Sequence, residues 1–262
     1  MEQQEIEKRL SDVMRFLRNQ REQITKLNAK MAQLENTLTH CLDDDLSLWL
    51  FRNRTERMDP TVPIFDVGRA DFHAARYRFA AARVKSLDVA DIACGTGYGC
   101  RFLMEPGKAK SVIGVDIAED AIAYATQRHR VPGIEYRCAP ANALPFESNS
   151  LDTIVSFETI ERVDDDLAVI SEFARVLREN GKLICSTPND WPLEIAPFHK
   201  KVYNRDSFRD LLSTKFNVLE MFNQNSGTDF DYNRAQKAGI VPTTDKNQFL
   251  AECFIAVCEV RK

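Results

Sequence analysis

The stretch Val89–Cys100 reads VADIACGTGYGC, and it decides the fold of the chain. A short apolar run ends in three alternating glycines, Gly95, Gly97 and Gly99. This pattern is typical of a buried strand that turns sharply into a helix. Glycines allow positive φ and let a ligand approach the backbone, and the helix that follows presents free N–H groups. We therefore predict a ligand-binding turn at this point of the chain.

Strand-like and helical patterns alternate after this stretch. Such alternation predicts an α/β fold with a parallel sheet and right-handed crossover connections. The last two apolar runs, at 215–222 and 249–262, are expected to pair as a hairpin at the sheet edge. The other strand-like runs lie at 87–94, 111–117, 133–139, 151–157 and 181–188, and the helical patterns lie near 70–85, 99–105, 118–130, 164–180 and 205–214.

The first 42 residues contain neither glycine nor proline. Apolar residues recur from Ile6 to Leu38 at alternating spacings of three and four, and only Gln20 interrupts them. This heptad pattern predicts a long coiled-coil helix. So narrow an apolar stripe needs a partner, which favours self-association as a dimer or trimer; packing against its own domain is the alternative. The predicted domains are the coiled-coil helix at 1–42, an irregular linker at 43–69 and the α/β domain at 70–262.

Composition excludes several classes of protein. The net charge of −4 argues against a general nucleic-acid binder, and no apolar run is long enough to span a membrane. The charged N-terminus does not resemble a secretory signal. Seven cysteines are scattered without a CxxC pair, which predicts buried free thiols rather than a zinc site. A cytoplasmic location is expected on these grounds.

The strand after the glycine turn discriminates between possible ligands. No Lys–Ser/Thr pair follows the glycines, so the turn is not a Walker phosphate loop. The next apolar run, VIGVDI, ends in Asp116. An acid at the end of the second strand can accept hydrogen bonds from both hydroxyls of a ribose, which NAD and S-adenosylmethionine both offer. Asp116 could also cap the helix expected from Ala118, and the two roles are compatible.

Four stretches, in their order and spacing, resemble the class I S-adenosylmethionine-dependent methyltransferases: DIACGTGYG, VIGVDIAEDAIAYA, APANALPFESNSLDTIVSFETIERV and FARVLRENGKLICSTPN. The likeness covers about residues 70–262 and is strongest to the type 11-like group that methylates sugars, glycans and small molecules. It implies a Rossmann-like, seven-stranded, mostly parallel sheet with helices on both faces and an antiparallel C-terminal strand. It also implies S-adenosylmethionine as cofactor, with S-adenosylhomocysteine as product, in place of NAD.

The resemblance implies roles for individual residues. Asp116 would bind the ribose hydroxyls, and Asp91 would hold the glycine turn near the methionine part of the cofactor. Ile117 would pack on the adenine face. The remaining cofactor contacts implied are the backbones of Ala93, Gly95 and Gly97, Ala141 and Asn142 at the adenine edge, and Phe157 beside the methionine part.

Two positions depart from the family pattern. Pro140 stands where the family often has an acid, and it offers neither a carboxylate nor an N–H group. Arg162 replaces the histidine of the family's ETIEHV motif, and an arginine does not act as a base. Pro140 therefore cannot supply the family's contact to the adenine amino group, and Arg162 cannot supply the base or metal chemistry of the histidine that it replaces. No metal site is predicted.

A hydroxyl acceptor would need a base to remove its proton. The candidates are His199, in the proline-rich loop after the fifth strand, Glu158 at the end of the fourth strand, and His73 on the helix near 70–85. Each could instead have a purely structural role. His40 and His129 are expected at the surface. The expected acceptor-binding residues are Arg76, Tyr77, Tyr98 and Tyr203, of which Tyr98 could equally pack beneath the helix that follows it.

Three functions remain open from the sequence. The first is an active methyltransferase that O-methylates a sugar, glycan or glycan precursor, which the loop around His199 favours. The second is a methyltransferase for another small molecule, such as a quinone, a lipid amine or a natural product, which an apolar lid would favour. The third is a cofactor-binding scaffold without catalysis, assembled through the coiled coil. The implied partners are the acceptor and further copies of the chain.

Overall fold

The computed structural model describes residues 45–54, 56–65, 67–194, 196–225 and 239–261, and a few helical positions between Arg21 and Asn28. The chain divides into two compact units, Met1–Arg52 and Asn53–Lys262. The rest of the predicted coiled-coil helix lies outside the described residues. None of the helices in the described part of the chain combines the length and apolar character that a membrane span requires.

The segment predicted as an irregular linker differs from that prediction. A helix, α2, spans Asp45–Asn53 within it, and Asp45 lies in the first turn, where a negative charge is favourable. Leu46, Trp49 and Leu50 recur at spacings of three and four, which is helical periodicity. Residues from Asn53 onward belong to the second unit, so the α/β unit begins earlier than residue 70.

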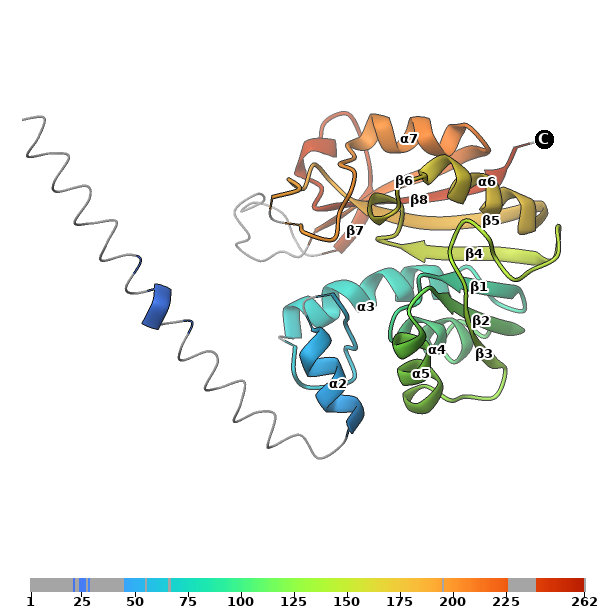
Figure 1. The fold of residues 1–262 in the computed structure, drawn as a ribbon. Helices are drawn as coiled ribbons and strands as arrows, with labels where there is room; N and C mark the ends of the chain where they lie inside the picture. The colour runs from blue at the N-terminus through green and yellow to red at the C-terminus, as the bar shows by residue number, and fades with distance from the viewer. Residues whose placement is uncertain are drawn as a thin grey trace, which may run out of the picture. The chain divides into compact units, whose positions relative to one another are not determined.

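One mixed sheet of eight strands forms the centre of the second unit (Figure 1). Its order is β3-β2-β1-β4-β5-β8-β6-β7, in which β1 to β5 are parallel and β8 runs antiparallel to both β5 and β6. The strands are β1 (Asp88–Ile92), β2 (Ser111–Asp116), β3 (Ile134–Cys138), β4 (Leu151–Phe157), β5 (Leu177–Pro188), β6 (Phe216–Asn225), β7 (Gly239–Pro242) and β8 (Cys253–Val260).

The strand count corrects the prediction of seven. The extra strand, β7, pairs with the end of β6 from Phe222 to Asn225 and forms the sheet edge. Its four residues, GIVP, contain too short an apolar run to be recognised as a strand without its partner. The two final apolar runs do pair antiparallel, as β6 and β8, but β8 lies inside the sheet and not at its edge.

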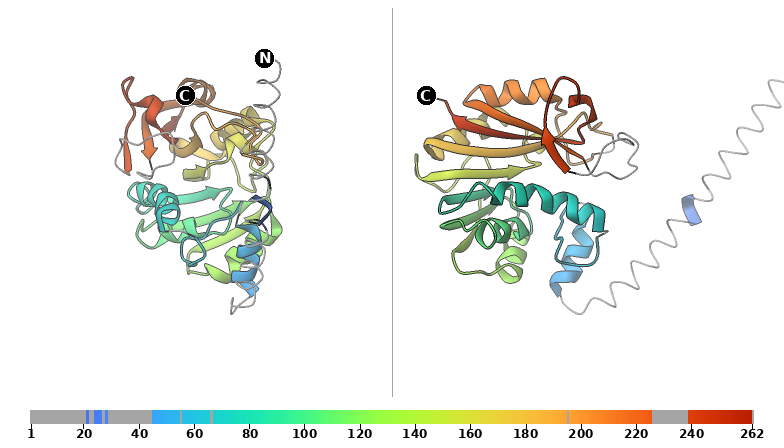
Figure 2. Two further views of the ribbon diagram at one scale, coloured as in Figure 1. Left: turned by 90° about the vertical axis from the view of Figure 1, so that its left-hand side faces the viewer. Right: turned by 180° about the vertical axis from the view of Figure 1, so that it is seen from behind.

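Helices cover both faces of the sheet, as predicted. The orange helix α7 (Arg205–Ser213) and α6 (Asp166–Val176) lie together above the strands, and α4 (Tyr98–Met104) and α5 (Glu119–Arg128) lie below them (Figures 1 and 2). Two buried apolar clusters follow from this arrangement. Phe173 and Phe208 belong to the first, with α6 and α7. Leu103 belongs to the second, which includes residues of α3 (Val67–Ala81).

The topology places three strand ends side by side. Strands β1 and β4 are neighbours although they are not consecutive, so the strand order reverses between them. Ligands bind outside the carboxyl ends of parallel strands at such a reversal. The glycine turn follows β1, Asp116 ends β2, and Glu158 follows β4. Residues far apart in the sequence therefore meet at one edge of the sheet.

Candidate active site

A cavity of about 540 Å³ lies along these strand ends. Its volume falls in the usual range for small-molecule sites. One end is formed by the glycine turn, Asp116 and the loop after β3. The other end is formed by α3 and the residues after β4. The residues that line it include Arg57, Met58, His73, Arg76, Tyr77, Ala93, Gly95, Thr96, Tyr98, Asp116, Ile117, Pro140, Ala141, Asn142, Phe157, Glu158, Arg162, Asp164, Asp165, Phe198 and Lys200.

The three glycines of the turn differ in what surrounds them in the structure. Gly95 has φ +54°, and a Cβ there would meet no atom within 4 Å, so its backbone is open to the cavity. Gly97 has φ +81° and does not line the cavity, and a Cβ on it would lie 2.6 Å from the Cβ of Ala125. A Cβ on Gly99 would lie 2.1 Å from the Tyr77 ring. Only the first of these glycines lines the cavity, and the other two allow close packing.

Asp116 is buried at the end of β2 and is held in place by backbone groups. Its Oδ2 accepts the N–H of Gly95 at 2.8 Å, and its Oδ1 accepts the N–H of Ala118 at 3.0 Å. A carboxylate has about four acceptor positions, so both oxygens retain capacity for a ligand hydroxyl. Asp116 can therefore accept the N–H of Ala118 at the start of α5 and still have acceptor positions for the predicted ribose hydroxyls.

The loop after β3 and the residue after Asp116 form an apolar wall. Ile117 is 70% exposed although it is a large apolar residue, and it lines the cavity. Pro140, Ala141 and Asn142 line the same end. An exposed aliphatic side chain beside an amide and open backbone offers a flat ligand both an apolar face and a polar edge. The structure thus brings these predicted residues together.

Asp91 lies beneath the cavity and does not line it. It is fully buried on β1, and it accepts hydrogen bonds from the Tyr77 hydroxyl at 3.2 Å and from Cys100 Sγ at 3.6 Å. Burial is the main cause that raises the pKa of Asp91 to about 7. Its contacts tie β1 to α3 and to the first turn of α4, which supports the glycine turn from below.

A segment that sequence analysis placed in the linker forms one wall of the cavity. The Thr96 hydroxyl donates to the carbonyl of Met58 at 2.5 Å, and Arg57 NH1 lies 3.9 Å from Asp116 Oδ2. Asp59, next in the chain, accepts from the Tyr124 hydroxyl at 3.0 Å and lies 2.7 Å from Nε2 of His129. Nothing in the sequence of this segment signals that it contacts the glycine turn.

The position of His129 corrects the sequence prediction. Its side chain is 1% exposed, not at the surface. The ring lies just after α5 and is paired with the buried carboxylate of Asp59, 70 residues earlier in the chain. A histidine in a polar stretch at a helix end gives no sequence signal of such a partner.

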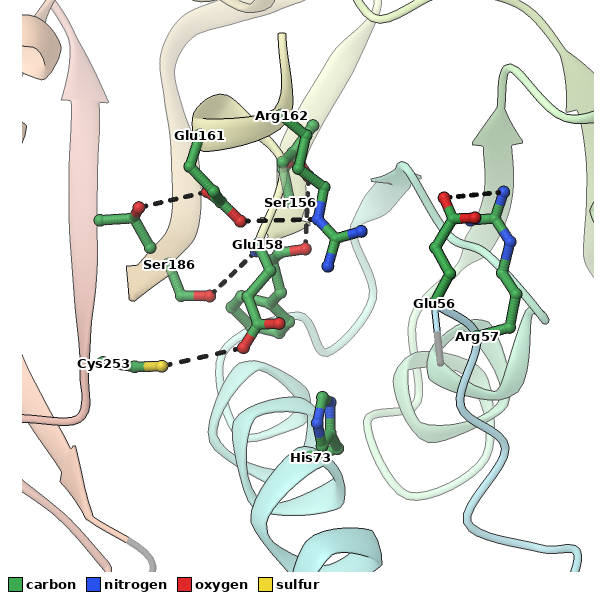
Figure 3. A network of polar contacts seen from close by, with 12 residues as sticks. Glu56, Arg57, His73, Ser156, Glu158, Glu161, Arg162, Ser186 and Cys253 are labelled. Atoms are coloured by element: carbon green, nitrogen blue, oxygen red, sulfur yellow. Dashed lines mark hydrogen bonds and ion pairs between the residues drawn. The ribbon is translucent and has the colours of Figure 1, made fainter. Parts of the chain in front are cut away.

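The other end of the cavity contains a buried ion pair. Arg76 on α3, 2% exposed, donates to Glu158 after β4. Arg76 NH2 also lies 2.9 Å from His73 Nδ1. In Figure 3 the His73 ring stands on α3 below Glu158, and Arg162 extends from the opposite side, on the 3-10 helix Ile160–Arg162. The predicted candidates His73, Arg76 and Glu158 are thus neighbours.

Electrostatics define the state of these groups. Burial first, and then the charge of Arg76, lower the pKa of His73 to about 4, so the ring is neutral at pH 7. Burial acts to raise the pKa of Glu158, but the charge and hydrogen bond of Arg76 outweigh it and hold that pKa well below its usual range. Glu158 is therefore a carboxylate committed to Arg76, which makes it a weak proton acceptor.

Of the four other predicted residues, three line the cavity and one does not. Tyr77 and Tyr98 line the cavity, and their ring centroids are 5.0 Å apart in an edge-to-face contact. Tyr98 therefore both faces the cavity and packs against α3. Phe157 lines it beside Tyr77, with 5.0 Å between ring centroids. Tyr203 does not line the cavity; its hydroxyl donates to Asp166, and its ring packs near Phe208.

His199 is half-buried and is not among the lining residues, although its neighbours Phe198 and Lys200 are. Its ring centroid lies 6.3 Å from that of Trp191. Its role as a base stays a prediction. No group of three or more metal-ligating side chains occurs among the described residues.

Comparisons with known proteins place this geometry in a family. Residues 90–185, which include the end of β1, the glycine turn and Asp116, match the model of the methyltransferase domain family Methyltransf_11. Over the matched segment, residues 90–185, the chain has a methyltransferase domain of the class I S-adenosylmethionine-dependent type. A probable S-adenosylmethionine-dependent methyltransferase of Mycobacterium tuberculosis (strain H37Rv) is 36% identical over 162 residues, covering 58% of this chain and 57% of that relative.

Two further relatives of the methyltransferase domain are informative. The fatty-acid O-methyltransferase of Mycolicibacterium smegmatis is 27% identical over 167 residues, 60% of each chain. The methyltransferase in a complex with the Haloferax volcanii Trm112 activator shares the fold, with a TM-score of 0.61, 19% identity and coverage of 74% of this chain and 92% of that one. The chain spans less than two thirds of the length of the two relatives found by sequence, the Mycobacterium tuberculosis methyltransferase and the fatty-acid O-methyltransferase.

The methyltransferase domain has residues that fit its cofactor. The open backbone at Gly95, the free acceptor capacity of Asp116 and the exposed apolar face of Ile117 match a methionine arm, a ribose and an adenine ring. Ala93, with φ +61°, holds the backbone of the turn in the left-handed region beside them. S-adenosylmethionine is the methyl donor of the family.

Proposed function

We propose that this chain is an active methyltransferase that passes a methyl group from S-adenosylmethionine to an oxygen of a lipophilic acceptor. One observation supports the proposal above the others. A single cavity joins the cofactor residues around Asp116 to the buried Arg76–Glu158 pair and His73. A structural scaffold has no need for a polar, partly buried cluster next to its cofactor site.

The cofactor, when bound, supplies a methyl group already activated by positive sulfur. The protein's contribution is alignment of the acceptor and exclusion of water. Tyr98 and Phe157 present aromatic rings on the wall between the two ends of the cavity. The buried pair Arg76–Glu158 fixes α3 against the end of β4, which keeps the acceptor end in a defined shape. These are positioning roles, and they need no metal ligand.

The loop after β5 supports a lipophilic acceptor. It exposes four large apolar side chains: Trp191, Leu193, Phe198 and Val202 are 41%, 42%, 42% and 44% exposed. Phe198 also lines the cavity. Exposed apolar side chains gathered on one segment beside a site are typical of a binding surface for apolar groups. The fatty-acid acceptor in the name of one relative agrees with this choice.

A sugar or glycan acceptor stays the alternative that sequence analysis favoured. Aromatic rings stack on sugars as well as on apolar chains, so Trp191 is compatible with both. The sugar proposal depended chiefly on His199, which does not line the cavity. This placement removes its main support, and we therefore prefer the lipophilic acceptor.

The proposal is tested in two steps. Calorimetry should detect binding of S-adenosylmethionine by the full chain. Incubation with methyl-labelled cofactor and a panel of amphiphiles, quinones and glycosides should then give a labelled product whose mass identifies the acceptor class. Tight cofactor binding without product from any acceptor would favour the scaffold, and labelled glycosides alone would favour the sugar alternative.

We also propose that the chain self-associates through residues 1–42. The support is the heptad pattern of the sequence, because a narrow apolar stripe is stable only against a partner helix. Light scattering on the full chain should give the mass of a dimer or trimer. A variant that begins at residue 43 should give the mass of one chain, and a monomeric full chain at micromolar concentration would contradict the proposal.

A further inference from the structure

Arg162 is a cation at the acceptor end that has no hydrogen-bonded carboxylate partner among the described residues. Its one ion pair among the described residues is to Glu161 at 3.8 Å, and its Nε atom is buried without a hydrogen-bond partner. Burial first, and then the charge of Glu158, raise the pKa of Glu161 to about 8, so this carboxyl group is mostly protonated at pH 7. Arg162 therefore brings to the cavity a guanidinium whose only carboxyl neighbour within 4 Å among the described residues is largely uncharged.

The other cations at this end are neutralised. Arg76 is paired with Glu158, and Lys200 Nζ lies 2.5 Å from Asp164 Oδ2. Of the three cations that line this end, Arg162 is the one without a carboxylate within hydrogen-bond distance among the described residues. A partly buried guanidinium without a partner is a favourable position for an anion, since arginine binds carboxylates through two parallel hydrogen bonds.

His73 is a hydrogen-bond donor in this arrangement. A guanidinium has only donors, so Nδ1 of His73 must accept the contact from Arg76 NH2 at 2.9 Å. A neutral ring that accepts at Nδ1 carries its hydrogen on Nε2. The free edge of the ring can therefore donate to an oxygen of the acceptor. It cannot remove a proton from that oxygen while the contact with Arg76 persists.

The lining residues offer a hydroxyl acceptor no effective base. Glu158 is held by Arg76, His73 is a donor, and Glu161 does not line the cavity. Asp164 and Asp165 do line it, but Asp164 is paired with Lys200, and Oδ1 of Asp165 accepts the N–H of Ala168 in the first turn of α6. Arg162 occupies the motif position where a histidine could have served. An acceptor that is already an anion needs no base, because it has no proton to lose.

We infer that the acceptor is a lipophilic carboxylic acid, and that its carboxylate is bound between Arg162 and Nε2–H of His73 and is the group that receives the methyl. This inference rests on the proposed function. A carboxylate oxygen forms the bond to the methyl carbon while the carbon–sulfur bond breaks and its electron pair stays on sulfur. The products are a methyl ester and S-adenosylhomocysteine, and no proton is transferred.

The direct test compares two acceptors that differ only in the head group. Decanoate and 1-decanol are titrated into the full chain in the presence of S-adenosylhomocysteine, and binding is measured by calorimetry. Decanoate should bind at least about tenfold more tightly, because its carboxylate accepts charge-assisted hydrogen bonds that the neutral hydroxyl of 1-decanol does not match. Mass spectrometry with labelled cofactor should detect methyl decanoate and no methyl decyl ether.

Variants separate this role from a structural one. Arg162→Gln should weaken decanoate binding by at least about tenfold with cofactor binding unchanged, and Arg162→Lys should restore part of it. His73→Gln, which keeps a donor, should be milder than His73→Leu. Arg101→Gln is the matched control, since Arg101 pairs with Glu105 on α4 and does not line the cavity. Thermal melts confirm that each variant is folded.

The outcomes are distinguishable. Equal or tighter binding of 1-decanol, or unchanged decanoate binding in Arg162→Gln, overturns the carboxylate inference. Methyl transfer to a hydroxyl by the same protein overturns the inference and leaves the proposed function intact. Absence of cofactor binding in the unmodified chain overturns the proposed function itself.

Discussion

Nε2 of His129 lies 2.7 Å from Oδ2 of Asp59, and both side chains are buried. The pair joins the end of α5 to the segment that carries Arg57 and Met58, so a contact outside the cavity fixes one of its walls. Burial acts to raise the pKa of Asp59, but hydrogen bonds, that with His129 foremost, outweigh it and hold the pKa below its usual value. The pair is therefore a structural element of the cofactor site.

Asp59→Ala should destabilise the protein and weaken cofactor binding together. Removal of one partner from a buried charged pair typically costs about 3–5 kcal/mol, and the wall at Met58 loses its support. Denaturant unfolding and calorimetry measure the two effects. Asp71→Ala is the control, because Asp71 is exposed and forms a surface pair with Arg78, so little change is expected there. Because the pKa of Asp59 is lowered, its contribution should be present at neutral pH and lost in acid.

Asp116→Ala should abolish most of the affinity for S-adenosylmethionine. The carboxylate supplies the acceptor positions for the ribose hydroxyls, and each hydrogen bond to a charged group contributes about 1.5–3 kcal/mol, so a loss of at least about tenfold is expected. Asp152→Ala removes a carboxylate that pairs with Arg178, away from the cavity, and should leave the affinity unchanged. Similar calorimetric affinities for the Asp116 variant and the unmodified chain would contradict the assigned site.

Gly99→Ala should destabilise the fold although Gly99 is not exposed to a ligand. A Cβ there would lie 2.1 Å from the ring of Tyr77, and overpacking of this kind costs about 1–3 kcal/mol. In the double variant with Tyr77→Leu, the smaller side chain should relieve the clash. The combined loss in unfolding free energy should then be smaller than the sum of the two single losses. Strictly additive losses would show that the ring is not the cause.

Glu161→Gln should stabilise the protein at neutral pH and flatten its dependence on pH. The pKa of Glu161 is raised from about 4.5 to about 8 by burial foremost, so the folded state binds this proton more tightly than the unfolded state. Stability should therefore fall as pH rises from the lower value to the higher one. Glutamine carries no proton to lose, and one unit of pKa shift corresponds to about 1.4 kcal/mol, so a gain above about 1 kcal/mol is expected at pH 7. Denaturant midpoints measured from pH 5 to 8.5 check it, and parallel curves for the two proteins would refute it.

The sequence by itself determined the α/β alternation, the glycine turn and the acid at the end of the second strand. These features are local, because each can be recognised within one short segment of the sequence. They are an apolar run, a turn that needs positive φ at Gly95, and an acid at a strand end. The matched family segment, residues 90–185, contains all of them. The extra strand β7 was not predictable, since four residues become a strand only through their partner β6.

Only the tertiary structure decided which polar groups share the cavity and in what state. The wall formed by Arg57 and Met58 depends on a contact between Asp59 and His129 across 70 residues. The donor role of His73 depends on Arg76, whose own charge is balanced by Glu158 from another strand end. The protonation state of a group depends on its burial and on the charges near it, and the residues that supply both come from distant segments of the sequence.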